Sequence, residues 1–341
     1  MTRSLSKLPL TPLCALMALA FTLPGRAIDP ARRMEMSYQF ELPAAPAGAQ
    51  TLELWVPLIG DDAHQRLLDR RIEASFPYTI TSDPLFHNTL LHARLPAATA
   101  GTLRVVSSVT RWEAAAAAAR LKSAERALYL RAERKVTLSP RVRALAAKIT
   151  TGKKSARDKA QAIYDYTVSV MSYDKTVPGW GEGDTERACD VKKGNCTDFH
   201  SLFISLARAS GMPARFIMGY PVPTGAPSGD IQGYHCWAEY YDPASGWVPV
   251  DASEASKHPE RKVYLFGHLD PDRVSISLGR DVILAPPQAG DAVNYLLKPY
   301  IEFDGKPVAP PAVKVSYADL PPEPQHAENI PAIPVASQPA N

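Results

Sequence analysis

The chain has 341 residues, a formal net charge of +3 at pH 7 and a hydrophobic content of 45%. These values are normal for a folded protein with one large domain or two. The small net charge does not support a nucleic-acid partner, because such binding relies on a strongly basic surface. The 32 prolines are many for this length, and a large share of them lie near the C-terminus.

Residues 1–27 are expected to be a secretory signal peptide. Arg3 and Lys7 form a basic start, an apolar run follows, and Gly25 and Ala27 put small residues where a signal peptidase cuts. The run is too short and too broken by proline for a comfortable membrane span, although an uncleaved anchor is the alternative. We therefore expect a periplasmic or secreted protein with no integral membrane span after cleavage.

Residues 28–112 are expected to form a β-rich N-terminal domain. The segments 36–42, 51–56 and 103–109 alternate between apolar and polar residues, as half-buried strands do. Breaks at proline and at Gly48 separate them. The pattern predicts a small sandwich-like module with no chemistry of its own.

Helices are predicted next along the chain. Residues 113–135 are rich in Ala, Arg and Leu and should form a connecting helix. A second helix should begin at the Ser-Pro pair 139–140, and a third at Ser155, because each start has a capping residue. They open a core domain predicted over 136–303. Beyond it, we expect 304–341 to be a proline-rich, largely disordered tail, with a possible short strand at 313–317.

A candidate nucleophile lies at the start of a further helix. Apolar residues recur there with the spacing of one helix face: Phe199, Leu202, Phe203 and Leu206. Asn195 is a good N-cap, and Asp198 puts a carboxylate into the first turn. Cys196 therefore lies where unpaired backbone N–H groups and the helix dipole favour a thiolate. The alternative is a small, buried apolar side chain.

The cysteine count favours a free thiol. Without the signal peptide, the chain keeps Cys189, Cys196 and Cys236. An odd number in an oxidising compartment allows at most one internal disulfide and leaves one thiol over. We expect Cys236 to face the opposite side of its strand from His235, as a core residue or as a disulfide partner of Cys189. Either outcome leaves Cys196 free.

A predicted hairpin supplies a histidine and an aspartate. Two strands joined by a turn over 242–246 follow from the alternation and from the turn residues. Pairing of Tyr241 with Trp247 would put His235 and Asp251 on one face as diagonal neighbours. A loop with an even number of residues, or a bulge, would put them on opposite faces.

These residues predict a site for nucleophilic catalysis. The expected catalytic residues are Cys196 as the thiol, His235 as its base and Asp251 as the carboxylate that orients the base. Tyr173 or Trp180 could supply an oxyanion donor, or could simply pack.

A zinc site is the competing chemistry. The residue types are suitable at five positions: Cys189, Cys196, His200, His235 and Cys236. No Cys-x-x-Cys occurs, and the adjacent His235 and Cys236 cannot both face one ion from a regular strand. We therefore expect neither a metal nor another cofactor. His200, one helical turn after Cys196, could contact the site, or could be packed or exposed elsewhere.

Three ordered motifs resemble the transglutaminase-like superfamily. They are the GNCTDF helix start at 194–199 with the GMPAR strand entry at 211–215, the YHCWAEY strand at 234–240 and the GWVPVD strand at 246–251. The likeness covers about residues 140–255. A looser similarity, over 266–281, is to exported bacterial members.

The resemblance implies a papain-like α+β fold. In it, the helix that carries Cys196 packs on an antiparallel sheet that carries His235 and Asp251, and these three residues form a Cys–His–Asp triad. The small β-sandwich-like domain, expected from the strand pattern, would precede this core. The resemblance leaves the reaction open, because the superfamily includes peptidases, amidases, cross-linking enzymes and inactive members. The chain lacks an acidic Ca²⁺-loop pattern.

We expect an exported, thiol-dependent acyl-transfer enzyme that acts on amide bonds of a protein or peptide substrate through a thioester. Release by water is preferred, as in a peptidase or amidase, because nothing in the sequence suggests a dedicated amine site. One alternative is a protein cross-linking transglutaminase. The other is a non-catalytic envelope binding or scaffold module with a vestigial triad.

Overall fold

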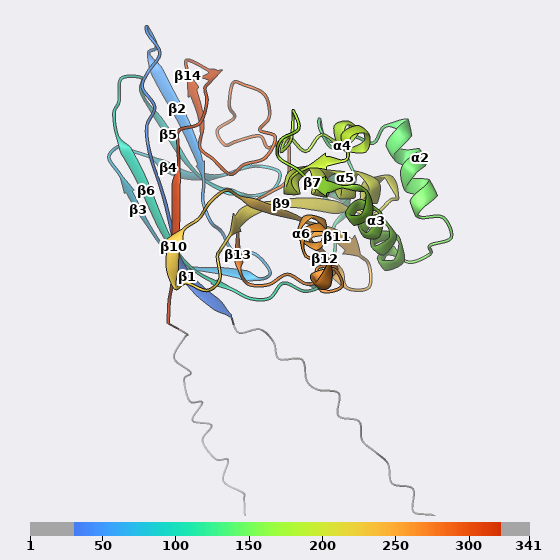
Figure 1. The fold of residues 1–341 in the computed structure, drawn as a ribbon. Helices are drawn as coiled ribbons and strands as arrows, with labels where there is room; N and C mark the ends of the chain where they lie inside the picture. The colour runs from blue at the N-terminus through green and yellow to red at the C-terminus, as the bar shows by residue number, and fades with distance from the viewer. Residues whose placement is uncertain (1–30, 322–341) are drawn as a thin grey trace, which may run out of the picture.

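The computed structural model describes residues 31–321, so the predicted signal peptide and the last residues of the predicted tail lie outside the described residues. Two five-stranded sheets stand beside a core of helices and a four-stranded sheet (Figure 1). Between residues 31 and 321, none of the helices has the length and apolar character needed to cross a bilayer.

Strands from both ends of the described chain build the β-rich module. Its first sheet has the order β10-β16-β1-β6-β3, and its second has the order β15-β14-β2-β5-β4. The first consists of β1 (Arg32–Glu41), β3 (Gln65–Ala74), β6 (Thr102–Arg111), β10 (Ser228–Asp230) and β16 (Lys314–Asp319). The second consists of β2 (Thr51–Pro57), β4 (Thr79–Ser82), β5 (Thr89–Pro96), β14 (Tyr300–Phe303) and β15 (Lys306–Pro307). Apolar side chains of both sheets form one buried cluster, which includes Leu54 and Val105.

The module is therefore not confined to 28–112, and the segment predicted as a disordered tail contributes to it. The strand expected at 313–317 is confirmed as β16, which pairs with β1 along its length. Val315 and Tyr317 are buried by this pairing. Composition could not show this, because the proline-rich segment gains order here from two strands that are distant in the sequence, β1 and β10.

The connecting helix predicted over 113–135 is wrong for most of its length. Only α1 (Ser123–Leu128) is helical. The alanines before it run as extended chain along the core: Ala114 exchanges backbone hydrogen bonds with Leu269, and Ala117 does so with Trp247. The high helix propensity of alanine is worth only a few tenths of a kcal/mol per residue, so these tertiary hydrogen bonds override it.

The core sheet has the order β12-β11-β9-β13 and is antiparallel. Its strands are β9 (Ala214–Pro221), β11 (His235–Asp242), β12 (Gly246–Val250) and β13 (Arg273–Leu278). Five helices belong to the core: α2 (Pro140–Ile149), α3 (Ala156–Val170), α4 (Thr185–Val191), α5 (Cys196–Ala209) and α6 (Ala252–Lys257). Short elements complete it: the parallel pair β7 (Ser172–Tyr173) and β8 (Lys193–Gly194), and the 3₁₀ turn η1 (Pro259–Arg261).

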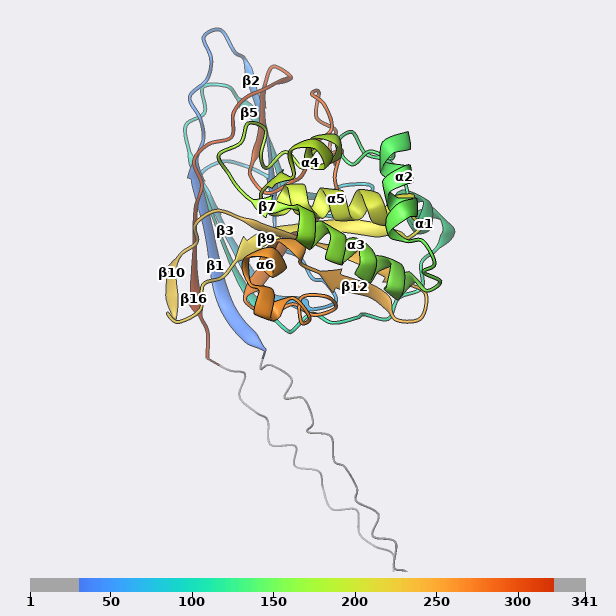
Figure 2. The ribbon, with the colours of Figure 1, turned by 45° about the vertical axis from the view of Figure 1, so that its right-hand side comes forward.

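Helix α5 is the centre of the core. It contacts β9 and β11 on one side and α2, α3, α4 and α6 around the rest (Figure 2). All but the last of its residues are buried. The predicted helix starts at Ser139 and Ser155 are confirmed, because each serine Oγ accepts a backbone N–H at the beginning of α2 or α3.

Candidate active site

The start of α5 is held by two reciprocal hydrogen bonds. Asn195 Oδ1 accepts the N–H of Thr197 at 2.9 Å, and Asp198 Oδ2 accepts the N–H of Asn195 at 2.9 Å. The predicted cap is thus confirmed as a full capping box. Gly194 is required beside it, because a Cβ there would lie 2.1 Å from Asp198 Oδ2. Cys196 becomes the first residue of the helix, with 1% of its surface exposed.

Asp198 also fixes the loop that leads to this helix. Its carboxylate accepts the N–H groups of Gly181 at 2.7 Å and of Gly183 at 3.1 Å. Burial raises the pKa of Asp198, although these N–H donors and Arg187 act against the rise. Asp198 therefore has a structural role, because it connects the loop that contains Gly181 and Gly183 to the helix start that carries Cys196.

The β11–β12 hairpin has the predicted register. Tyr241 pairs with Trp247, and His235 Nε2 lies 2.6 Å from Asp251 Oδ2. The predicted proximity of His235 and Asp251 is therefore confirmed. Asp251 also caps α6, because its Oδ1 accepts the N–H of Glu254 at 3.0 Å. This cap fixes the carboxylate in the position from which it holds the imidazole.

The charges around His235 and Cys196 favour a thiolate–imidazolium pair. Burial by itself would lower the pKa of His235, but the charge and hydrogen bond of Asp251, together with Cys196, raise it to about 10. Burial would raise the pKa of the Cys196 thiol, but hydrogen bonds with Cys236 and His235 hold it well below its ordinary value. Since Nε2 of His235 is bound to Asp251, the hydrogen bond between His235 and Cys196 falls to Nδ1.

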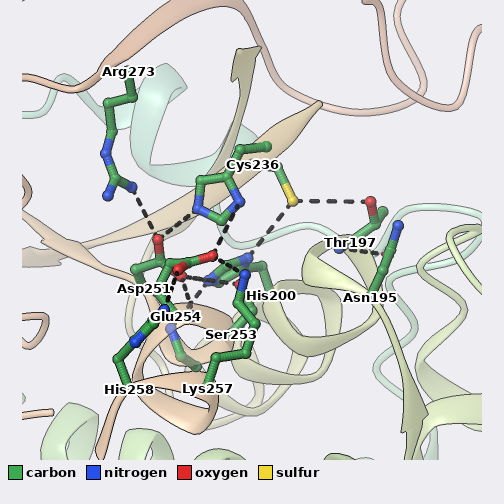
Figure 3. A network of polar contacts seen from close by, with 12 residues as sticks. Asn195, Thr197, His200, Cys236, Asp251, Ser253, Glu254, Lys257, His258 and Arg273 are labelled. Carbon is green, nitrogen blue, oxygen red and sulfur yellow. Dashed lines mark hydrogen bonds and ion pairs between the residues drawn. The ribbon is translucent and has the colours of Figure 1, made fainter. Parts of the chain in front are cut away.

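Arg273, which lies within the looser similarity over 266–281, binds the same carboxylate. Its Nη1 donates to Asp251 Oδ2 at 2.9 Å (Figure 3). The guanidinium also pairs with Asp270 and lies 5.5 Å from the Trp237 ring centroid. Burial would raise the pKa of Asp251, but His235, His200 and Arg273 hold it well below its usual range. Asp251 is therefore ionised although it is fully buried.

Cys236 lies in the core, as predicted, but it also contacts the candidate nucleophile. Its Sγ is 3.8 Å from Thr197 Oγ1 and 3.6 Å from His200 Nδ1 (Figure 3). Cys236 also shares a hydrogen bond with Cys196. Burial and the neighbouring Cys196 sulfur raise the pKa of Cys236. The possible disulfide with Cys189 is not present, because both are free thiols. The alternation of β11 predicts the burial, but only the position of the helix start beyond the strand end creates the contact.

His200 is packed behind these two sulfurs. It is fully buried, and its Nε2 accepts the N–H of Ala252 at 3.1 Å. Its Nδ1 faces the Cys236 sulfur, and its Nε2 also lies 3.5 Å from Asp251 Oδ1. Of the two residues considered as oxyanion donors, Tyr173 is half-buried against Phe199 and Trp180 is 39% exposed.

Two cavities meet beside the helix start. One has a volume of about 880 Å³ and the other about 380 Å³, and both are lined by Tyr234, Val293 and Tyr295. The Tyr234 hydroxyl accepts from Asn195 Nδ2 at 2.7 Å and lies 3.3 Å from Thr197 Oγ1. The shared wall of the cavities thus contacts both neighbours of Cys196 in the chain, although Cys196, His235 and Asp251 line neither cavity. Across residues 31–321, no group of three or more His, Cys, Asp or Glu side chains is arranged to hold a metal ion.

Residues 143–252 match the family model of the transglutaminase-like superfamily. The chain carries a transglutaminase-like core. The matched segment begins in α2 and ends at the first residue of α6, so it includes Cys196, His235 and Asp251.

Relatives of the transglutaminase-like core occur in several bacteria. An uncharacterized protein of Haemophilus influenzae is 32% identical over 212 residues, which are 53% of this chain and 58% of that protein. A protein-glutamine gamma-glutamyltransferase of Pseudomonas aeruginosa is 28% identical over 120 residues, 33% of this chain and 18% of that protein. The chain therefore spans only part of the length of these relatives.

The fold extends beyond the matched core. The crystal structure of a candidate cysteine protease from Cytophaga hutchinsonii superposes with a TM-score of 0.59 at 16% identity, and the match covers 86% of this chain and 92% of that one. The predicted α+β, papain-like and transglutaminase-like fold class is thus confirmed, with helices packed on an antiparallel sheet.

Proposed function

We propose that this protein is a thiol-dependent acyl-transfer enzyme in which Cys196 attacks an amide carbonyl of a peptide or protein. The observation that carries the proposal is the bonded series Cys196, His235 and Asp251, with the pKa of the thiol lowered and that of the imidazole raised. A purely structural cysteine, buried in apolar surroundings with no histidine partner, would have a raised pKa and remain inert. The name of the Pseudomonas relative, a gamma-glutamyltransferase, agrees with this chemistry.

The proposed first half-reaction begins from the Cys196 thiolate and the His235 imidazolium. The Cys196 thiolate adds to the carbonyl carbon, and His235 then gives its Nδ1 proton to the leaving amine as the C–N bond breaks. A thioester and a neutral imidazole remain. Asp251 keeps the ring oriented and stabilises its charged form, as the carboxylate of a catalytic triad does. Arg273 and the α6 cap hold that carboxylate in place.

In the second half-reaction, either water or an amine takes the acyl group. Water would make the protein a peptidase or amidase, and an amine would make it a cross-linking enzyme. Export to the periplasm or outside the cell is proposed from the sequence pattern of residues 1–27 alone.

The test begins with thiol labelling. A small alkylating probe is suitable because Cys196 is 1% exposed. We expect rapid labelling of the native protein at neutral pH that is lost in Cys196→Ala and retained in Cys189→Ala, whose thiol has a pKa raised by burial. Equal labelling of wild type and Cys196→Ala would refute the nucleophile.

Turnover is then measured by mass spectrometry with a mixed library of glutamine-containing peptides and primary amines. We expect products with wild type and none with Cys196→Ala or His235→Ala. Absence of any product with wild type would favour a binding or scaffold module with a vestigial triad.

A further inference from the structure

A third cavity lies between the β-rich module and the core sheet. Its volume is about 490 Å³, which is within the usual range of small-molecule sites. The module contributes the loops before β3 and β5 and the end of β6, and the core contributes β9, β11, β12 and β13. The side chain of Asp61, which lines the cavity, is 59% exposed, so the cavity opens to solvent at that end.

This cavity lies on the face of the core sheet that is opposite α5. Cys236 of β11 points toward α5, because its Sγ lies 3.8 Å from Thr197 Oγ1 in the first turn of that helix. Trp237 and Glu239 alternate with such residues along β11, and both line the cavity. The sheet therefore separates this cavity from the thiol of Cys196.

A buried guanidinium with an unused donor lines the cavity. Arg111, at the end of β6, is 1% exposed, and its Nη1 donates to both oxygens of Asp62 at 3.0 Å. Its Nε is also buried and has no hydrogen-bond partner among residues 31–321. A buried donor of this kind is costly unless an acceptor satisfies it. Arg111 therefore points to a ligand with a carboxylate or another strong acceptor.

The charge of the lining argues against a simple anion. Four carboxylates and two guanidiniums line the cavity: Asp61, Asp62, Glu125, Glu239, Arg111 and Arg215. Asp62 and Glu239 each pair with one guanidinium, which leaves a surplus of negative charge. Burial and the charge of Arg111 lower the pKa of His64, so this ring adds no positive charge at neutral pH. A ligand that brings a carboxylate to Arg111 must therefore also bring a cation.

Glu239 is the carboxylate best placed for that cation. Its side chain is 11% exposed, and Arg215 approaches its Oε2 with Nε at 2.6 Å and with Nη2 at 2.5 Å. Within the described chain both bonds go to Oε2, which leaves Oε1 for another donor. Burial lowers the pKa of Arg111 and the charge of Glu239 acts against this, so the two groups are electrostatic neighbours. A small molecule with both charges therefore fits between them.

Much of the remaining wall is apolar. Trp237, Trp247 and the buried side chains of Phe86 and Ile217 line the cavity. An apolar group of the ligand would remove these surfaces from water, which favours binding by about 25 cal/mol per Å². The lining therefore combines a place for a carboxylate, a place for an ammonium and an apolar wall.

An ion pair that stabilises the loop before β3 is the simpler explanation of Arg111. The pair with Asp62 is joined to the core by Ser275, whose Oγ donates to Asp62 Oδ2 at 2.5 Å. This explanation accounts for Nη1 of Arg111 but not for its Nε, nor for the surplus of carboxylates around the cavity. A water molecule on Nε would account for the first of these, and the experiment below separates water from a ligand.

We propose that this cavity binds a zwitterionic α-amino acid with an apolar side chain, with its carboxylate on Arg111 Nε and its ammonium on Glu239. The proposal goes beyond the proposed function and does not depend on it. An amino acid in this cavity is neither the acyl donor nor the acceptor, because the sheet lies between it and Cys196.

The experiment is isothermal titration calorimetry of the full protein with L-leucine at pH 7. We expect leucine to bind, and we expect binding about tenfold weaker for two analogues, which each lack one charged contact. Leucinamide lacks the carboxylate, and 4-methylpentanoate lacks the ammonium. No binding of leucine would overturn the proposal and leave water as the partner of Arg111, and equal binding of 4-methylpentanoate would overturn the zwitterion.

Two variants test the contacts. Arg111→Lys keeps a positive charge beside Asp62 but has no Nε–H, so leucine binding should weaken about tenfold. Its matched control is Arg104→Lys on the same strand, which alters an exposed pair with Glu73 outside the cavity and should leave the affinity unchanged. Glu239→Gln should weaken leucine binding and reduce the preference for leucine over 4-methylpentanoate.

Circular dichroism establishes which variants are folded, and Glu239→Gln carries the test if Arg111→Lys does not fold. A folded variant at either position that binds leucine as tightly as wild type would refute the site. Cys196→Ala should bind leucine with the wild-type affinity. Loss of binding in that variant would place the ligand at the thiol instead, and would equally overturn the proposal.

Discussion

Replacement of Asp251 by asparagine should separate the geometry of the site from its charge. The amide can keep a hydrogen bond to His235, whose Nε2 lies 2.6 Å from the carboxylate, but it removes the negative charge that this buried ring requires. The pKa of His235 is about 10 against an ordinary value of 6.5. The difference, 10 − 6.5 = 3.5, corresponds to about 5 kcal/mol of stabilisation of the imidazolium.

Asp251 is the main source of this stabilisation, since its charge and hydrogen bond are the leading causes that raise the pKa. Without the charge, burial should dominate and lower the pKa of His235 towards or below its ordinary value. The thiolate–imidazolium pair exists only while His235 holds its proton. The alkaline limit of activity should therefore move to lower pH, and kcat/KM at neutral pH should fall by about 10⁴-fold.

The assay is the rate of Cys196 alkylation and of peptide turnover as a function of pH. Asp165→Asn is the matched control, because it removes an exposed carboxylate that pairs only with Lys262 among the ion pairs of the described chain. Circular dichroism would establish that the variant is folded. An Asp251→Asn protein that is folded and keeps the wild-type pH profile would refute the assignment of Asp251 as the residue that orients and charges His235.

Further predictions concern the neighbours of the site. Cys236→Ala removes a hydrogen bond that lowers the pKa of Cys196, so the pH at which alkylation begins should rise by about one unit; an unchanged midpoint would show that the contact does not stabilise the thiolate. Asp270 has a pKa of about 2 against 3.8, so its stabilisation is present above pH 3.8 and is lost as the pH falls towards 2. Asp270→Asn should therefore lower the free energy of unfolding by about 2 kcal/mol at pH 7 and flatten its acid dependence, as denaturant titrations would measure; equal stability at pH 7 would contradict this. Gly194→Ala should cost about 2–4 kcal/mol, because the new methyl group would collide with Asp198; thermal unfolding of this variant at the wild-type temperature would contradict the collision.

Local patterns in the sequence were sufficient for the parts of the site that depend on local structure. The cap and the apolar spacing placed Cys196 at a helix start, and the alternation with an odd turn placed His235 beside Asp251. Both results follow from local structure. Capping side chains accept the unpaired N–H groups of a helix start, and the turn sets the register of a hairpin.

Contacts between distant segments were decided by the tertiary structure alone. Arg273 binds Asp251 from β13, the strand at the opposite edge of the sheet from β12, and Lys257 reaches Tyr173 across more than 80 residues of chain. The approach of Cys236 to Cys196 depends on where α5 begins above β11. None of these contacts leaves a periodic signal, because each depends on the docking of whole elements.

Two predictions were wrong for the same reason: the connecting helix before α1 and the disordered tail around β16. The alanine-rich segment before α1 has the composition of a helix, yet its backbone bonds to Leu269 and Trp247. The proline-rich segment around β16 has the composition of a tail, yet it pairs with β1. The sequence by itself therefore determined the helix that carries Cys196 and the hairpin that carries His235 and Asp251. Only the tertiary structure decided which remote strands and charged side chains surround this helix and this hairpin. The reason is that hydrogen bonds to distant partners outweigh local propensities of a few tenths of a kcal/mol.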